Sequence, residues 1–186
     1  MKDPHIRKIL RQTILQPYIE DRDSKVVEEM KLPLAKARID MAVINGHLHG
    51  YEIKGASDSL VRLGGQIEGY QKVFDYVTVV TEAKHYGKVY DFLPNWVGIS
   101  VCSNTNGEEK LSCIREASLN TAQSPFHLAQ LLWHDELVEI LSEQNIPFKK
   151  KDRNWILCKA IINNIPIETL TRLVREKLKS RTNWQA

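Results

Sequence analysis

The stretch RIDMAVINGHLHGYEIKG, residues 38–55, contains two strand-like runs on either side of an Asn-Gly pair. An Asn-Gly pair between apolar runs favours a tight turn, so the stretch predicts a β-hairpin that turns near Gly46. In that hairpin, residues whose numbers sum to about 92 face each other, which places Asp40 opposite or nearly opposite Glu52. Lys54 follows Glu52 by two positions, so both side chains project from the same face.

The hairpin thus brings two carboxylates and one ammonium group together, and two interpretations are open. On an exposed face, the charges form cross-strand ion pairs worth about 0.2–1 kcal/mol each. In a site, two facing carboxylates repel each other unless a cation lies between them, and oxygen ligands suit Mg²⁺ or Mn²⁺. A lysine beside such an ion can orient a water molecule and offset charge on a phosphoryl group. Taken alone, the hairpin favours surface pairing.

A helix predicted after the hairpin changes this balance. Apolar residues recur at three- and four-residue steps from Leu60 to Phe74, which predicts an amphipathic helix over residues 58–74. Gln66 and Tyr70 are four residues apart and therefore share one face of that helix. Because only a short polar loop separates the helix from the hairpin, we expect this face to overhang the carboxylates.

The rest of the first 120 residues alternates between helical and strand patterns. A helix is predicted from Pro4 and is expected to end or kink at Pro17, and the segment 24–37 fits either a short strand or a linker. A β-branched run at residues 76–81 is typical of a strand covered on both faces. A short helix and two strands are predicted at 89–93, 96–103 and 109–117. Together these elements predict an α/β fold with a mixed β-sheet core flanked by helices.

Helical periodicity takes over after about Ser124. One long helix is predicted over residues 124–144, and two shorter helices over 154–164 and 166–181. We therefore expect an α/β core at residues 1–120 and a C-terminal helical module at 121–186, which contacts DNA or packs on the core.

Composition places the chain among ordinary globular proteins. With 186 residues, 42% of them hydrophobic, it is long enough for a buried core, and a net charge of +3 permits a nucleic-acid partner without demanding one. Three scattered cysteines, Cys102, Cys113 and Cys158, fit reduced thiols rather than a disulfide framework or a metal knuckle. Since the sequence has neither an apolar leader nor a stretch of membrane-spanning length, we expect a cytoplasmic protein with no membrane partner.

The order Asp40, then Glu52-Ile53-Lys54, then Gln66-x-x-x-Tyr70 resembles the PD-(D/E)XK nuclease superfamily. The Gln–Tyr element is similar to the extra motif of its RecB-like branch, and residues 37–81 look like an uncharacterised bacterial and phage family within it. The likeness covers the α/β region and extends more loosely through the C-terminal helices. One departure is Ile39, which stands where the superfamily usually has proline. The resemblance implies a restriction-endonuclease-like fold and metal-dependent hydrolysis of phosphodiester bonds.

Carried over residue by residue, the resemblance implies a role for each position of the hairpin motif. Asp40 and Glu52 would hold Mg²⁺, with Mn²⁺ as a possible substitute, and the Ile53 carbonyl would be a third oxygen ligand. Lys54 would position or activate the attacking water.

The resemblance also implies supporting roles outside the hairpin. Gln66 would contact the metal-bound water or the substrate, and Tyr70 would support the helix or contact a phosphate. An upstream acidic residue is expected, for which Glu29 is the first candidate and Glu28 the second.

Basic residues near the motif and in the helical module are candidate DNA contacts. Arg38 and Arg62 flank the motif, and Arg62 lies four residues before Gln66, where it can meet a phosphate or pair with an acidic residue. A basic run between two predicted helices fits a solvated loop and a phosphate-backbone contact equally well. Its members are Lys149, Lys150, Lys151 and Arg153.

Two functions from different classes remain open. The first is a Mg²⁺-dependent nuclease that acts on DNA rather than RNA. The second is a protein of the same fold that binds nucleic acid or a protein partner without cutting, such as a phage or mobile-element effector. An inactivated relative has no chemical reason to keep Asp40, Glu52, Lys54 and Gln66 together, so the sequence favours the nuclease.

Overall fold

The structure is a computed structural model that describes residues 1, 3–33 and 37–184. Its core is one six-stranded sheet in which the strands follow one another in chain order. The strands are β1 (Lys25–Lys31), β2 (Arg38–Ile44), β3 (Leu48–Lys54), β4 (Tyr76–Glu82), β5 (Gly98–Thr105) and β6 (Glu108–Arg115). Strands β3, β4 and β5 pair in parallel and the other neighbours are antiparallel. The predicted α/β fold with a mixed sheet is confirmed.

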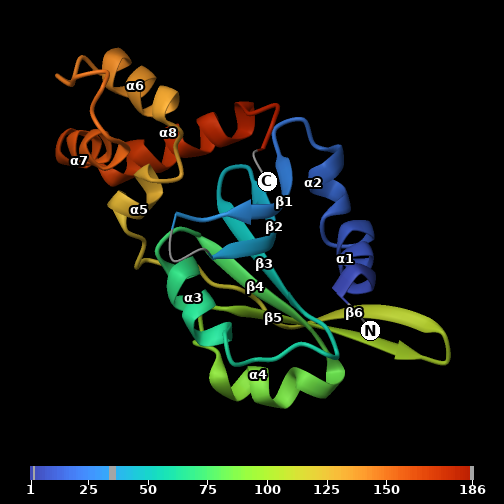
Figure 1. Cartoon of the computed structure of the whole chain (residues 1–186). Coiled ribbons are helices and arrows are strands. Elements are labelled where there is room, and N and C mark those ends of the chain that lie inside the picture. Colours follow the sequence, from blue (N-terminus) through green and yellow to red (C-terminus); the bar gives the residue numbers. More distant parts are fainter. Residues whose placement is uncertain (2, 34–36, 185–186) are drawn as a thin grey trace.

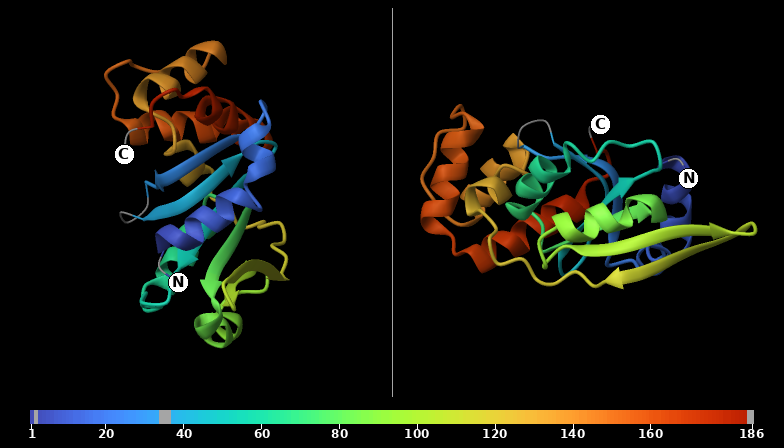
Figure 2. Two further views of the ribbon diagram at one scale, coloured as in Figure 1. Left: turned by 90° about the vertical axis from the view of Figure 1, so that its right-hand side faces the viewer. Right: turned by 90° about the horizontal axis from the view of Figure 1, so that it is seen from below.

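Helices cover both faces of this sheet (Figure 1). The N-terminal pair α1 (Asp3–Gln12) and α2 (Gln16–Glu20) lies on one face, and α3 (Leu63–Gln71) and α4 (Tyr86–Phe92) lie on the other. The C-terminal helices are α5 (Pro125–Ala129), α6 (His134–Glu143), α7 (Asn154–Asn164) and α8 (Ile167–Ser180). They gather at one end of the sheet, while the β5–β6 hairpin projects at the other (Figure 2). Among the described helices, none is long and apolar enough to cross a membrane.

Two hydrophobic clusters hold these layers together. The smaller one packs Ile6 and Leu10 of α1 against Met41 and Val43 of β2. The larger one lies under α3 and α4 and continues into the C-terminal helices. Buried side chains therefore run without interruption from the sheet into the helical module, and the division of the chain at residue 120 remains a prediction.

The β2–β3 hairpin has the predicted register. Met41 pairs with Tyr51 and Ile44 with Leu48, and the Asn45 side chain closes the turn by accepting a hydrogen bond from the His47 N–H at 2.9 Å. The segment 24–37, which fitted a strand or a linker, forms β1 over residues 25–31; residues 34–36 of that segment lie outside the described residues.

Three predicted helices were wrong in extent. The N-terminal helix, expected to end or kink at Pro17, already ends at Gln12, and Pro17 lies in the first turn of α2. The helix expected over 58–74 is confined to α3, because the Asp58 carboxylate accepts the Gly55 N–H at 2.7 Å and holds the preceding residues in a turn. The helix expected over 124–144 is divided into α5 and α6. Trp133 is extended (φ −74°, ψ 163°) and its N–H donates to the Glu136 carboxylate at 2.7 Å, which begins a new helix at His134.

Candidate active site

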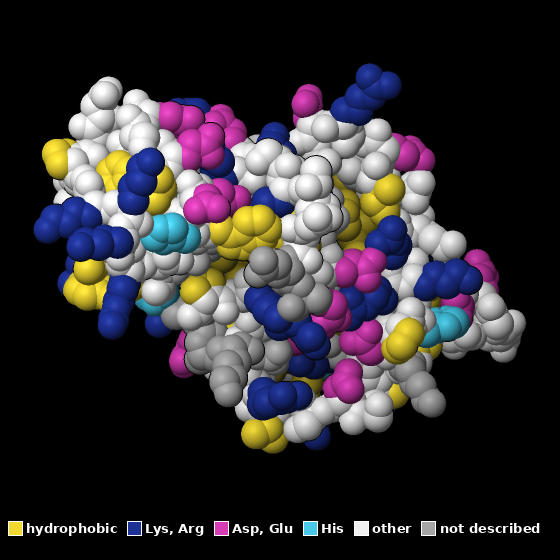
Figure 3. Space-filling view, turned by 45° about the horizontal axis from the view of Figure 1, so that its top comes forward, with side chains coloured by type: hydrophobic (Ala, Val, Ile, Leu, Met, Phe, Trp, Pro, Cys, Tyr) yellow, Lys and Arg dark blue, Asp and Glu magenta, His cyan; other side chains and the backbone are white. Residues whose placement is uncertain are grey.

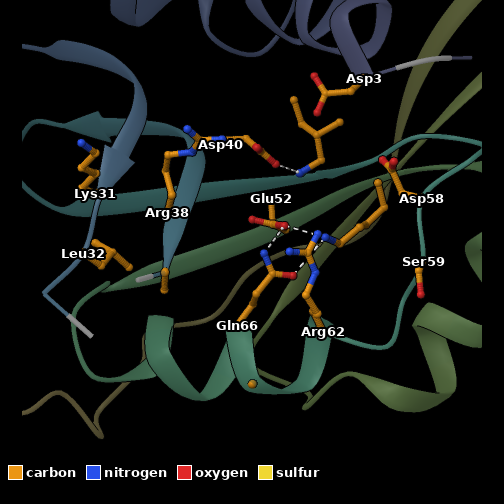
Figure 4. Close-up of a pocket in the computed structure, with 14 residues that line it drawn as sticks. Asp3, Lys31, Leu32, Arg38, Asp40, Glu52, Asp58, Ser59, Arg62 and Gln66 are labelled. Carbon is orange, nitrogen blue, oxygen red and sulfur yellow. Dashed lines mark hydrogen bonds and ion pairs between the residues drawn. The ribbon is translucent and has the colours of Figure 1, made fainter. Parts of the chain in front are cut away.

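A cleft of about 800 Å³ lies between the sheet and helix α3 (Figure 4). Strands β2 and β3 supply one wall, and the turn before α3 together with its first residues supplies another. The predicted site residues that line it are Arg38, Asp40, Glu52, Ile53, Lys54, Arg62 and Gln66. The structure thus brings together the hairpin motif, the Gln66 helix and both flanking arginines.

Glu52 lies at the centre of a buried hydrogen-bonded cluster. Its side chain is 3% exposed and that of Lys54 is 8% exposed, and Lys54 Nζ donates to Glu52 Oε1 at 2.7 Å. Gln66 Nε2 donates to the same oxygen at 2.7 Å, while Gln66 Oε1 accepts from Lys54 at 3.0 Å. The Tyr70 hydroxyl donates to Glu52 Oε2 at 2.6 Å. The helix face carrying Gln66 and Tyr70 therefore covers the carboxylate as predicted, with Tyr70 beneath the cleft.

Asp40 approaches the end of β3 from the neighbouring strand. Its Oδ2 accepts the Ile53 N–H at 2.7 Å. The backbone pairing of β2 with β3 ends at Met41 and Tyr51, so Asp40 lies directly beyond the last pair. In an antiparallel strand the N–H and C=O of one residue point to the same side. The Ile53 carbonyl therefore points toward Asp40, which gives two carboxylates and one peptide oxygen at this edge of the cleft.

A shift in strand alternation positions Asp40. In β2, Ala42 and Ile44 pack on the α3 side of the sheet; strict alternation would place Ile39 on the other side, yet it packs with them. In β1, Val27 and Met30 share that side although they are three residues apart. Between them Glu29 has φ 55°, a left-handed conformation that is rare for a side chain with a Cβ atom. In both strands the alternation of side chains between the two faces of the sheet is therefore shifted at the same level, next to the cleft.

Glu29 is not among the residues that line the cleft, and ion pairs with two arginines connect it to the site. Arg7 of α1 donates to Glu29 Oε1 at 2.7 Å, and Arg38 Nε lies 2.5 Å from the other carboxylate oxygen. The second candidate, Glu28, pairs with Arg11 and, at 3.6 Å, with Arg7. Lys149, Lys150, Lys151 and Arg153 lie on the loop between α6 and α7 and in the residue before α7, away from the cleft lining.

Arg7 is the residue that the sequence did not reveal. Its guanidinium donates to the Asp40 carbonyl at 3.0 Å and to Asp40 Oδ1 at 3.5 Å, besides its bond to Glu29. A further bond of 3.3 Å reaches Asp3. The only sequence signal was the Asp3–Arg7 spacing of four residues, which is common on exposed helices. In the folded chain Arg7 is a fixed cation among carboxylates from three elements.

Replacing Arg7 with Gln tests this arrangement. We expect the metal-free protein to lose about 1–3 kcal/mol of stability, because three carboxylates lose a charged donor. Affinity for a divalent cation should rise, since the negative charge is no longer offset. Thermal unfolding with and without Mg²⁺ measures both effects. Arg11→Gln is the matched control, because Arg11 is 43% exposed and its one ion pair within the described residues is with Glu28; equal behaviour of the two variants would contradict the assignment.

Burial and the neighbouring carboxylate change the acidity of Asp40. Burial raises the pKa of Asp40 to about 7 and is the largest cause of the shift, and repulsion from the Glu52 carboxylate is the second. The hydrogen bond from the Ile53 N–H and the charge of Arg7 act in the opposite direction and lower this pKa. Burial and the adjacent Glu52 also raise the pKa of Tyr70, which keeps its hydroxyl a donor. Near neutral pH the Asp40 carboxyl is therefore poised between its neutral and charged forms, and a nearby cation favours the charge.

The donor set fits a hard divalent cation held largely by water and substrate. Among the described residues, no group of three or more His, Cys, Asp or Glu side chains is placed to hold a metal ion. Asp40, Glu52 and the Ile53 carbonyl remain, and Mg²⁺ commonly binds through one or two carboxylates while keeping several waters. Arg7 pairs with Glu29 and with the Oδ1 atom of Asp40, whereas Asp40 Oδ2 accepts the Ile53 N–H.

Comparison with known proteins identifies the family. The profile described as "Bacteriophage P4 protein cII" matches residues 2–185. The chain belongs to the phage P4 cII family. A curated member, "Protein cII" of Enterobacteria phage P4, is 25% identical over 159 residues, which cover 86% of this chain and 60% of that protein. This cII-family chain thus matches less than two thirds of the length of that relative. A protein of unknown function from Silicibacter pomeroyi aligns over 70% of this chain and 86% of its own, with 15% identity and a TM-score of 0.43.

Proposed function

We propose that this cII-family chain is a metal-dependent nuclease that hydrolyses phosphodiester bonds of DNA in the cytoplasm. The observation that carries the proposal is the buried Glu52–Lys54 pair, bound by Gln66 and adjacent to Asp40 on one cleft wall. A buried ion pair of this kind contributes little net stability compared with apolar residues of similar size. Its position at a cleft with oxygen ligands supports a catalytic role.

Each residue of the hairpin motif would have one role in the reaction. Asp40, Glu52 and the Ile53 carbonyl would hold one Mg²⁺, or Mn²⁺ in its place. When bound, such an ion polarises a phosphoryl oxygen and makes a water molecule more acidic. Lys54 Nζ donates to Glu52 and Gln66, which leaves one of its three N–H groups to orient the attacking water, and its charge would offset that of the phosphate.

The other cleft residues would position these groups and the DNA. Gln66 holds Lys54 and Glu52 together through its amide, and Tyr70 fixes the second Glu52 oxygen. Arg38 and Arg62 line the same cleft and supply forked donors suited to backbone phosphates.

A second candidate function has one observation in its favour. Arg7 already places a cation against Asp40, which is compatible with a nuclease-fold module that binds nucleic acid or a protein partner without a metal ion. The family's description supports a phage or mobile-element context for either function.

The two candidates differ in a direct assay. The purified chain is incubated with linear duplex, closed circular and single-stranded DNA, each with Mg²⁺, Mn²⁺ or EDTA. The nuclease proposal expects products only when a divalent ion is present, and the circular substrate separates internal from terminal cutting. Binding without product under every metal condition would reject cleavage and favour the second candidate.

The pH dependence of metal binding is a further prediction. Metal binding requires the charged carboxylate, so Mn²⁺ affinity should rise by up to about tenfold per pH unit from about pH 5 to 7 and level off above that range. In the metal-free protein the folded carboxyl holds its proton up to about pH 7, whereas the ordinary value is 3.8. Stability should therefore fall as pH rises between about 4 and 7. Calorimetric titration and urea unfolding measure these trends, and Asp40→Asn should remove both.

A further inference from the structure

A second charged surface lies on the helical module, around the loop from α6 to α7. Residues 145–160 contain five Lys or Arg residues and one Asp, so their net charge is 5 − 1 = +4, whereas the whole chain has +3. The remaining residues together therefore carry 3 − 4 = −1. Figure 3 shows basic side chains, with hydrophobic ones among them, at the end of the molecule that the C-terminal helices form. The positive charge of the chain is thus concentrated here.

These cations are not neutralised by neighbouring acids. Within the described part of the chain, no ion pair includes Lys149, Lys150, Lys151, Arg153 or Lys159. Two acidic residues of α6 pair instead with basic residues in and directly after α8: Glu139 with Lys177 at 2.8 Å, and Glu136 with Arg181 at 2.5 Å. The loop is left as an uncompensated basic surface.

The basic loop has internal hydrogen bonds and a firm anchor. The Asp152 N–H donates to the Lys149 carbonyl at 2.9 Å, and Asp152 Oδ2 accepts the Lys149 N–H at 3.1 Å. His134 of α6 contacts the loop and the first residue of α7, with Nε2 3.0 Å from the Lys150 carbonyl and Nδ1 2.8 Å from Asn154 Oδ1. The lysines therefore project from an ordered backbone at the start of α7.

An exposed tryptophan adjoins these charges. Trp155 is 47% exposed in the first turn of α7, and Lys159 Nζ lies 5.0 Å from the centre of its ring. Ile156 beside it is 36% exposed. We propose that Trp155, flanked by the basic loop and Lys159, is a stacking platform for an unpaired base of single-stranded DNA. The inference rests on the proposed function for DNA as the ligand.

The surface chemistry favours a single strand over other partners. Single-strand binding proteins combine cations that follow the phosphate backbone with aromatic rings on which bases stack. Bases in a duplex are stacked on each other and cannot use the Trp155 ring. A protein partner for this surface would have to supply several carboxylates.

Binding without cleavage tests the platform. Anisotropy of a labelled oligothymidylate of about 15 nucleotides is measured in EDTA with the wild type, Trp155→Ala and Trp155→Phe. We expect Trp155→Ala to weaken binding by about tenfold and Trp155→Phe to retain most of it, because a phenyl ring still stacks. Lys150→Gln with Lys151→Gln should reduce the salt dependence of binding. Tyr90→Ala is the matched control, since Tyr90 is 46% exposed with Arg115 over its ring, and it should bind like the wild type.

The outcome of this binding measurement does not depend on whether the protein cuts DNA, because EDTA prevents metal-dependent cleavage. Binding by Trp155→Ala within twofold of the wild type would overturn the platform, even if the protein cuts DNA, and would leave this surface to a protein partner. Loss of binding in Trp155→Ala with rescue by Trp155→Phe would support it, even if no cleavage is found.

Discussion

Replacing Asp40 with Asn is expected to reduce DNA cleavage by at least about 10³-fold, because the variant loses one of two carboxylates available to a divalent ion. The fold should survive, since burial already favours the uncharged form of this side chain and an amide oxygen can still accept the Ile53 N–H. At pH 8 the metal-free variant should even be more stable than the wild type. Initial rates on labelled duplex DNA, together with urea unfolding, measure the two effects.

Asp91→Asn is the control for the first prediction. Asp91 is exposed on α4, outside the cleft lining, so the loss of its charge should leave the cleavage rate within about twofold of the wild type. Cleavage by Asp40→Asn at the rate of this control would mean that Asp40 does not serve the reaction.

Replacing Glu52 with Ala is expected to have the largest effect on stability, a loss of about 3–5 kcal/mol. The change leaves Lys54 buried without its counter-charge, and Gln66 and Tyr70 lose the acceptor that they share. Urea unfolding measures the loss. Cleavage by this variant is uninformative by itself, which makes Asp40 the better position for testing catalysis.

A double variant distinguishes a buried pair from general damage to the core. Glu52→Leu combined with Lys54→Met removes both charges while keeping apolar bulk, so it should be clearly more stable than Glu52→Leu alone. A double variant that is no more stable than the single one would contradict the account of a buried, mutually dependent pair.

The central part of the fold could be predicted because its signals are local. The Asn-Gly turn sets the hairpin register, which then determines that Glu52 and Lys54 share a face. Four-residue spacing similarly placed Gln66 and Tyr70 together. The start of α6 also has a local signal, Glu136 three residues after Trp133, which the apolar periodicity of residues 124–144 obscured.

The acidic environment of Arg7 could not be predicted, because it depends on contacts between distant segments. Arg7 lies 22 residues from Glu29 and 33 from Asp40 in the sequence, and helical periodicity does not specify which strand edge a helix covers. The left-handed backbone of Glu29 is equally unmarked, since nothing in the sequence KVVEEMK distinguishes it from a regular strand.

The proposed reaction requires one divalent ion shared by Asp40 and Glu52, and a crystal grown with Mn²⁺ would show whether that ion binds there. The anomalous difference map should contain one peak per chain, within coordination distance of both carboxylates and of the Ile53 carbonyl. The same crystals of Asp40→Asn should lack it. A peak confined to other residues, or none at a Mn²⁺ concentration that supports DNA cleavage, would mean that Asp40 and Glu52 do not share a metal ion.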